Sequence, residues 1–331
     1  MEEFIKNVVL PLVINIATLL LLLAPGVILK KCRLVGEEFG KGLSNLVLYV
    51  AQPLLIFCAY LDYSGDARIW SNALWVLILS LLAHTLFAVV ALLFFRGAEE
   101  GRRRMLRFAT VFSNSAYMGI PLISAVLGAE ATIYASIYNI VFNVFLWSFG
   151  VWLCTTEEAR ESEKKPLSAI VLKVAVHPVN IAAVLGLLCL AFNASAYLPP
   201  VVADILGGSF AYLKNLVAPL SMIIIGLRLA TTSFRGAFRD RYLYLLLALR
   251  HLLLPAVLLV LLHLLAYVIP LGDTVNEVVI ILAATPAATA VTMFAEKYGC
   301  DTAYASRSVL ISTLLAVVTM PLVVLAYGLL F

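Results

Sequence analysis

The sequence predicts an all-α polytopic membrane protein with about ten transmembrane helices, arranged as two inverted five-helix repeats whose fourth and ninth helices are broken. Three observations lead to this fold class. The chain is more apolar than soluble proteins are, and a single polar stretch divides it into halves that each hold an odd number of crossings. Each half also contains a proline-bearing interruption of an apolar run, at 112–121 and 283–289.

The composition excludes a soluble protein. Hydrophobic residues make up 63% and charged residues 13% of the 331 residues, and the mean hydropathy is +1.03. Soluble domains contain roughly 45–50% apolar and about 25% charged residues. Most of the chain must therefore face lipid. The net charge of +4 is spread over particular loops, so no nucleic-acid partner is expected, and the five cysteines show no motif spacing. We expect neither a metal nor a cofactor.

Each expected crossing is an apolar run long enough to span a bilayer. In the first half the runs are Ile5 to Leu29, Gly42 to Leu61, Trp70 to Phe95, Met105 to Leu127 and Thr132 to Cys154. In the second half they are Val176 to Phe192, Ala211 to Leu229, Tyr242 to Val268, Val275 to Ala295 and Ala303 to Leu330. The first run follows Glu2 and Glu3, where a cleavable signal would carry basic residues, so we expect it to be retained.

The polar stretch Thr155 to Pro166 separates the halves. We therefore expect a first repeat over residues 1–154, a cytoplasmic linker over 155–175 and a second, inverted repeat over 176–331. Short echoes recur in the same order in both halves. Tyr134-Ala135-Ser136 opens the fifth crossing as Tyr304-Ala305-Ser306 opens the tenth, and Leu82-Ala83-His84 is answered by Leu249-Arg250-His251. Such ordered echoes predict an internal repeat.

Basic residues orient the bundle, because positive charge is retained on the cytoplasmic side of a membrane. One set of alternate loops contains Lys30, Lys31, Arg33, Lys41, Arg96, Arg102, Arg103, Arg104, Arg107, Arg160, Lys164, Lys165, Arg235, Arg239, Arg241 and Lys297. The opposite loops and the N-terminal tail contain little beyond Lys6, Arg68 and Lys214. We expect a multi-pass protein of the cell membrane with both termini outside.

The two interruptions predict the functional site. Proline lacks a backbone donor and clashes with the preceding turn, so it frees carbonyl groups that lipid cannot satisfy. Unwound backbone at membrane depth occurs where protein or a watery cavity covers it, and matched breaks in two inverted halves indicate a transporter's substrate site.

Polar side chains at these breaks are candidate substrate ligands, since amides and hydroxyls bind carboxylates and a resuming helix adds its positive dipole end. The candidates at the breaks are Asn114, Ser115, Tyr117, Gly119, Pro121, Thr285, Pro286 and Thr289. Asn139 and Asn143 lie four apart on one face of the fifth helix. For all of these residues the alternative is a structural role: the polar groups satisfy freed carbonyls or a neighbouring helix, and Gly119 allows close helix packing.

Three ionisable residues within the apolar runs are candidates for a role in transport. Arg250 lies near the middle of the eighth crossing, where an unpaired arginine costs at least about 2.5–3.5 kcal/mol. It is interpreted as a counter-charge for an anionic substrate, as a cap for carbonyls of a broken helix, or as a side chain that reaches the headgroups. His84 and His251 occupy related positions and carry a proton or are simply packed.

The ordered set of motifs resembles the auxin efflux carrier family, whose plant members are the PIN carriers. The residues that carry the resemblance are Asn114 to Pro121, Leu127 to Glu130, Asn139, Asn143, Trp147 to Gly150, Ala284 to Ala287 and Ala295 to Gly299. The chain lacks the Asn-Pro-Asn crossover of plant carriers and has a very short central loop, so a prokaryotic organic-acid carrier is the better analogue.

The resemblance implies two inverted five-helix repeats. In this family helices 1, 2, 6 and 7 form a scaffold that often dimerises, and helices 3–5 and 8–10 form a transport domain whose fourth and ninth helices cross near the substrate. It implies a secondary carrier of small organic anions, auxin-like or dicarboxylate, that works by alternating access. The expected partners are the anion, the lipid bilayer and a second copy of the chain.

Other functions remain open at this point. One is a sodium- or proton-coupled organic-anion symporter of the related bile-acid-symporter-like fold. An intramembrane enzyme would need a nucleophile or metal motif, and the sequence contains neither His-Glu-x-x-His nor Gly-x-Ser-x-Gly. A channel would be identified by a ring of pore charges. We therefore predict a non-enzymatic carrier.

Overall fold

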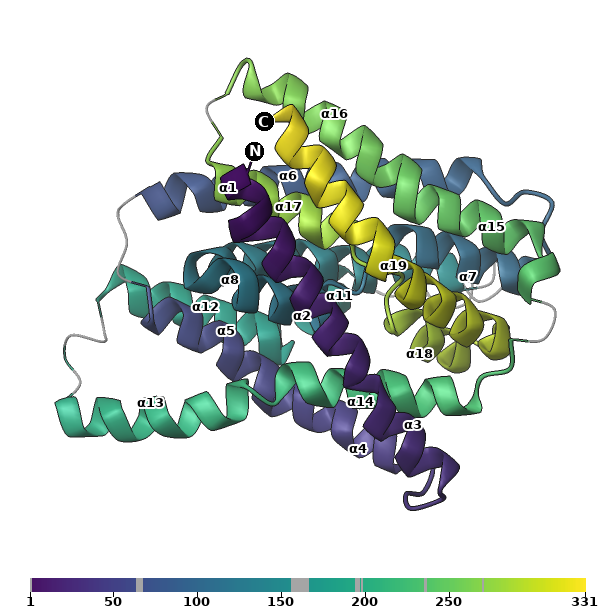
Figure 1. Cartoon of the computed structure of the whole chain (residues 1–331), viewed down its shortest axis with the longest axis horizontal. Helices are drawn as coiled ribbons and strands as arrows, with labels where there is room; N and C mark the ends of the chain where they lie inside the picture. The colour runs from purple at the N-terminus through teal and green to yellow at the C-terminus, as the bar shows by residue number, and fades with distance from the viewer. Residues whose placement is uncertain are drawn as a thin grey trace.

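The computed structural model describes residues 2–63, 68–155, 167–193, 197, 199–234, 237–269 and 271–331. These residues are almost entirely helical, and within them the one β-type contact is an isolated antiparallel bridge between Ser113 and Ala287. Figure 1 shows the helices as a bundle in which both termini lie at one end. The two terminal helices touch there, since the rings of Phe4 and Tyr327 are 6.0 Å apart.

The first half consists of apolar α-helices interrupted by π-helical segments. Its elements are α1 (Glu2–Phe4), η1 (Ile5–Val9), α2 (Leu10–Leu21), α3 (Leu23–Lys31), α4 (Phe39–Leu46), η2 (Val47–Ala51), α5 (Gln52–Leu61), α6 (Arg68–Leu93), α7 (Glu100–Val111), η3 (Ser115–Gly119), α8 (Ile120–Phe145), η4 (Leu146–Gly150) and α9 (Val151–Cys154). Within α8, Gly128 has φ +80°. It makes the turn between the predicted fourth and fifth crossings, because glycine tolerates this conformation.

The second half is also helical in its described part. Its elements are α11 (Leu167–Ala175), α12 (Pro178–Ala191), α13 (Pro200–Lys214), α14 (Val217–Thr231), η6 (Ala237–Arg239), α15 (Arg241–Ala248), η7 (Leu249–Leu253), α16 (Leu254–Ala266), α17 (Asp273–Ala284), α18 (Ala290–Lys297) and α19 (Thr302–Leu330). Most of the predicted linker lies outside the described residues, but its last part forms α11. A bend of 67° separates α11 from α12, because Pro178 holds His177 in an extended conformation.

Seven described helices are long and apolar enough to cross a membrane, or eight if the bent pair of α11 and α12 is one span. The protein is thus an all-helical polytopic membrane protein. The number is smaller than the predicted ten for a physical reason. The breaks leave α7, α17 and α18 too short to qualify, and the turn at Gly128 leaves two predicted crossings within one span, Ser115–Cys154. The ten-crossing arrangement stays a prediction.

Close helix contacts hold the lower part of the bundle in Figure 1 together, where α3 crosses α14. A Cβ atom built on Gly226 would lie 2.2 Å from the carbonyl oxygen of Leu23, and one on Gly26 would lie 2.2 Å from that of Ile223. Helix α5 packs on α12 in a related way, with Gly186 against the ring of Tyr60. Small residues permit this approach between membrane helices.

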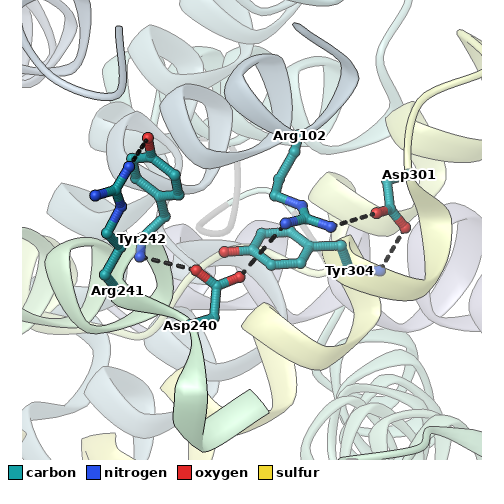
Figure 2. Close-up of polar contacts among 6 residues, drawn as sticks. All are labelled: Arg102, Asp240, Arg241, Tyr242, Asp301 and Tyr304. Atoms are coloured by element: carbon teal, nitrogen blue, oxygen red, sulfur yellow. Dashed lines mark hydrogen bonds and ion pairs between the residues drawn. The ribbon is translucent and has the colours of Figure 1, made fainter. Parts of the chain in front are cut away.

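Charged residues connect the ends of α7, α15 and α19. Figure 2 shows Arg102 of α7 between two carboxylates, 3.8 Å from Asp240 and 3.8 Å from Asp301. The guanidinium also lies over the ring of Tyr304, 4.7 Å from its centroid. Asp240 accepts a hydrogen bond from the N–H of Tyr242, and Asp301 accepts one from that of Tyr304. Each aspartate therefore caps the helix that follows it, and Arg102 joins the two caps.

Candidate functional site

The chain leaves the helical conformation at both interruptions. Helix α7 ends at Val111, and Phe112 is extended with φ −93° and ψ 114° before η3 begins at Ser115. Helix α17 ends at Ala284, and Thr285 is extended with φ −59° and ψ 152°. Thr285 precedes Pro286, and a residue before proline is disfavoured in the helical region. The second break thus results directly from the proline that follows Thr285.

The two breaks lie against each other and satisfy each other's backbone groups. The N–H of Asn114 donates to the carbonyl of Pro286 at 2.7 Å, and the N–H of Ala288 donates to that of Phe112 at 2.9 Å. These bonds form the antiparallel bridge between Ser113 and Ala287. Breaks that are far apart in the sequence therefore cross as two short extended segments, which resolves the problem of unpaired backbone at membrane depth.

Arg250 forms hydrogen bonds to the backbone of both broken helices next to the point where they cross. It lies in η7 with 0% of its surface exposed. Its guanidinium donates to the carbonyl of Thr110 at 3.3 Å, to that of Ala283 at 2.6 Å and, through two nitrogens, to that of Thr285 at 2.9 and 3.2 Å. Carbonyls from both broken helices thus share one cation. Of the interpretations drawn from the sequence, this geometry matches the carbonyl cap.

The two histidines are buried in different surroundings. His251 contacts Thr319 through Nδ1 at 2.9 Å and Ser312 through Nε2 at 2.8 Å. Ser312 in turn accepts a hydrogen bond from the N–H of Ala287 at 2.9 Å. His251 therefore supports a hydroxyl that holds the crossing. His84 bonds the carbonyl of Ser80 at 2.8 Å and lies among aromatic rings. Proton transfer by either residue stays a prediction.

A cavity of about 120 Å³ opens beside the crossing. It is lined by Leu48, Gln52, Ser113, Asn114, Ala116, Tyr117, Asn139, Phe142, Asn143, Leu146, Trp147, His177, Val179, Ala288, Thr289, Ala290, Met293 and Phe294. The lining comes from both halves of the sequence. It is mostly apolar and aromatic with a few polar groups, which is the usual character of a small-molecule site.

Five of the predicted ligands line this cavity: Asn114, Tyr117, Asn139, Asn143 and Thr289. Asn114 is 1% exposed, and among the described residues neither its Oδ1 nor its Nδ2 has a hydrogen-bond partner. Oδ1 of Asn139 and Oε1 of Gln52 are also buried without a hydrogen-bond partner among the described residues. Buried polar atoms are almost always paired, so these groups are available to a bound molecule or to water.

The other predicted ligands make structural contacts beside the cavity. Pro286 and Thr285 supply the carbonyls that accept from Asn114 and Arg250. A Cβ atom on Gly119 would lie 2.5 Å from a side-chain carbon of Leu282, so this glycine permits the close approach of η3 to α17. Ser115 begins η3, and the buried Pro121 follows η3 directly in α8, with Gly119 and Ile120 already in helical conformation. Substrate contact by these residues stays a prediction.

Several lining residues were not predicted as ligands from the sequence. Trp147 and His177 face the cavity from η4 and from the bend before α12. The side chain of Lys173 lies over the Trp147 ring, 4.9 Å from its centroid. The pair His177-Pro178, a polar residue before a proline inside an apolar run, was the available signal for the bend. Within the described ranges no group of three His, Cys, Asp or Glu residues is placed to hold a metal ion.

Comparison with known proteins gives two matches. The family model described as "Membrane transport protein" matches residues 11–324. An uncharacterized transporter of Methanothermobacter thermautotrophicus is 26% identical over 310 residues, which cover 93% of this chain and 96% of that protein.

Proposed function

Because the chain belongs to the membrane transport protein family, the family of the auxin efflux carriers, we propose that it is a secondary carrier of small organic anions. The resemblance drawn from the motifs is thus confirmed at the level of the family. The single observation that carries the proposal is the crossing of two broken helices beside a small cavity, where the Asn114 amide has no hydrogen-bond partner among the described residues. An amide N–H and the positive end of a resuming helix stabilise a carboxylate.

The proposed architecture is ten crossings in two inverted repeats. Contacts in the structure support this arrangement, since helices that would be equivalent make equivalent pairs. Helix α3 of the first crossing packs on α14 of the seventh, and α5 of the second crossing packs on α12 of the sixth. Each half also supplies one break to the crossing.

Within this architecture we assign two moving parts. The proposed scaffold comprises residues 2–63 and 167–234, and the proposed transport domain comprises 68–155 and 237–331. The cavity lies between them, since Leu48 and Val179 belong to the first and Asn114 and Thr289 to the second. Polar contacts span the boundary: the Tyr117 and Ser44 hydroxyls are 3.0 Å apart, and Gln52 donates to the carbonyl of Ala116 at 3.0 Å. Alternating access follows when the transport domain moves against the scaffold.

The same proposal includes the cellular setting. The carrier works in the cell membrane with both termini outside, as the positive-inside rule predicts, and forms a homodimer through the proposed scaffold. The exposed apolar side chains of α13, such as Val201 and Ile205, suit a lipid or helix contact.

Counterflow into proteoliposomes tests the function. Purified protein is reconstituted with an excess of unlabelled anion inside, and uptake of labelled malonate, malate or indole-3-acetate is followed. We expect saturable uptake by the wild type, and an affinity lowered about tenfold in Asn114→Ala, because one charge-assisted hydrogen bond is worth roughly 1.5 kcal/mol.

Asn15→Ala is the matched control. Asn15 lies on α2, and its amide donates to the carbonyl of Pro11 at 2.9 Å, away from the cavity. It should transport as the wild type does. If Asn114→Ala keeps both affinity and rate, the proposed site is wrong. Repeating the flux with imposed proton, sodium and voltage gradients identifies the coupling ion.

A further inference from the structure

The described part of the cavity wall has no formal charge, although the proposed substrate is an anion. Among the described residues that line the cavity, none is Asp, Glu, Lys or Arg. A carboxylate that enters an uncharged site of low polarity loses hydration and needs a partner. Within the described part of the chain, a cationic partner would have to come from a residue just behind the lining.

Arg250 does not meet this need. It already makes four hydrogen bonds to the carbonyls of Thr110, Ala283 and Thr285. A guanidinium has five N–H donors, so moving it toward a ligand would leave carbonyls of both broken helices unpaired. Its bonds fix the crossing in place.

Arg228 lies on the other side of the second break and is engaged differently. It belongs to the last turn of α14, two residues after Gly226, where α14 crosses α3. Its Nη1 donates to the carbonyl of Thr289 at 3.2 Å, and Thr289 lines the cavity. The side chain is partly buried, and among the described residues no carboxylate oxygen lies within 4.0 Å of it.

The hydrogen bond between Arg228 and Thr289 connects the two proposed parts of the carrier. Arg228 belongs to the proposed scaffold, whereas Thr289 belongs to the proposed transport domain. Helix α14 also packs on η3, so Arg228 emerges from a helix that touches the first break as well. Among the described residues the Arg228 side chain hydrogen-bonds one neutral carbonyl, and Glu296 is near enough to act on its charge without a direct bond. A partly buried guanidinium gains more from a carboxylate bonded directly, which accepts two parallel N–H bonds from it.

We propose that Arg228 is the residue that recognises the carboxylate of the transported anion, and that it exchanges the carbonyl of Thr289 for that carboxylate when the anion binds. The inference rests on the proposed function and adds the source of its charge selectivity. Because the Arg228–Thr289 contact spans scaffold and transport domain, the exchange also releases one contact that holds the present conformation.

Arginine is favoured here over the lysines near the cavity. The ammonium groups of Lys173 and Lys297 lie over the ring of Trp147, at 4.9 and 5.9 Å from its centroid. They contact a side chain of the wall, while Arg228 reaches the broken backbone itself.

The test uses the full-length protein in proteoliposomes, with labelled malonate, malate and indole-3-acetate as probes. Arg228→Gln removes the charge, and Arg228→Lys keeps it without the bidentate geometry. Arg241→Gln is the matched control, because Arg241 is exposed and bonds Tyr242 at the end of the bundle (Figure 2). For any probe that the wild type transports, we expect KM to rise about tenfold or more in Arg228→Gln, less in Arg228→Lys and not at all in Arg241→Gln.

A second measurement separates recognition from folding. The thermal midpoint of the detergent-solubilised protein is followed with malonate and with its neutral diamide, malonamide. Malonate should raise the midpoint of the wild type and of Arg241→Gln more than malonamide does, and Arg228→Gln should lose this difference. If Arg228→Gln keeps the wild-type KM and the malonate shift, the inference is overturned and the proposed function stands. If the wild type transports none of the three anions, the proposed function fails and the inference fails with it.

Discussion

Arg250 illustrates at the scale of one residue how a membrane protein manages a buried charge. Its guanidinium has no carboxylate partner among the described residues and is instead shared by carbonyls at the ends of α7 and α17. Those carbonyls are unpaired in their own helices because the helices stop there. One cation thus meets two needs, since the oxygens solvate the charge and the charge stabilises the oxygens.

We expect Arg250→Met to destabilise the protein strongly. Each buried carbonyl that loses its donor costs about 1–3 kcal/mol, so the free energy of unfolding should fall by roughly 3 kcal/mol or more. Thermal unfolding in detergent, followed by the loss of monodisperse protein, measures this change. A variant that keeps the wild-type midpoint but loses anion affinity would contradict the capping role and would favour direct contact with substrate.

The position of Arg250 was predictable from the sequence, but its partners were not. An arginine nine residues after Arg241 in an apolar run lies at membrane depth by helix geometry alone. Its bonds to Thr110 and Ala283 depend on how three distant helices meet, and no local signal encodes that. Arg228 was not predicted as a ligand, because a cation near a helix end commonly interacts with the helix dipole or with lipid headgroups. Its contact with Thr289 also depends on distant helices meeting.

At the scale of elements, the glycine contact between α3 and α14 brings two helix backbones directly together in the proposed scaffold. The atoms that a Cβ on Gly226 would meet belong to the backbone of Leu23. A backbone cannot rotate away as a side chain does, so the two helices would have to separate.

We therefore expect Gly226→Ala to lower the free energy of unfolding by about 1–3 kcal/mol through overpacking. This loss exceeds the gain of roughly 0.5–1 kcal/mol that alanine brings to a helix. Gly207→Ala is the control: Gly207 is also helical, in α13, but a Cβ there would meet nothing within 4 Å. It should be neutral or slightly stabilising. Equal thermal midpoints for the two variants would show that the α3–α14 crossing tolerates separation.

The elements themselves were predicted unevenly. The break at 283–289 follows from Pro286, because proline acts on the residue before it. The first break was predicted within 112–121 from Pro121, but the chain leaves the helix at Phe112 and is helical again from Ser115, so Pro121 is not its cause. The start of the seventh crossing was predicted at Ala211, whereas α13 begins at Pro200. Proline is well placed at the first position of a helix, but the exposed segment that follows it contains Asp204 and two glycines, which weaken the apolar pattern. The π-helical segments η2, η3 and η4, which all contribute to the cavity, leave no recognised pattern in sequence.

At the scale of the whole molecule, alternating access requires that the proposed transport domain moves relative to the proposed scaffold. The two parts touch at one end of the bundle through the terminal helices, where a Cβ on Gly328 of α19 would lie 2.2 Å from Cε1 of Phe4. Neither residue lines the cavity. A covalent link at this point would therefore restrict movement without altering the site.

We expect a cross-link between Phe4→Cys and Gly328→Cys to abolish counterflow. The Phe4 substitution removes the ring that a side chain at 328 would meet, so the two thiols fit within reach of a short bifunctional methanethiosulfonate. The background replaces the native Cys32, Cys58, Cys154, Cys189 and Cys300 with alanine. Uptake of labelled anion should fall to the level of empty liposomes after cross-linking and return when a reductant cleaves the linker.

The control pair joins two positions within the proposed scaffold. Asp62 and Lys214 form an ion pair of 2.9 Å, and both are more than marginally accessible, with 55% and 25% of their side chains exposed. Cross-linking Asp62→Cys to Lys214→Cys should leave uptake unchanged, because both residues would move together in a scaffold that acts as one body. Full transport by the cross-linked Phe4–Gly328 pair would exclude the assigned division into two moving parts, and a block by both pairs would show that movement occurs within the scaffold itself.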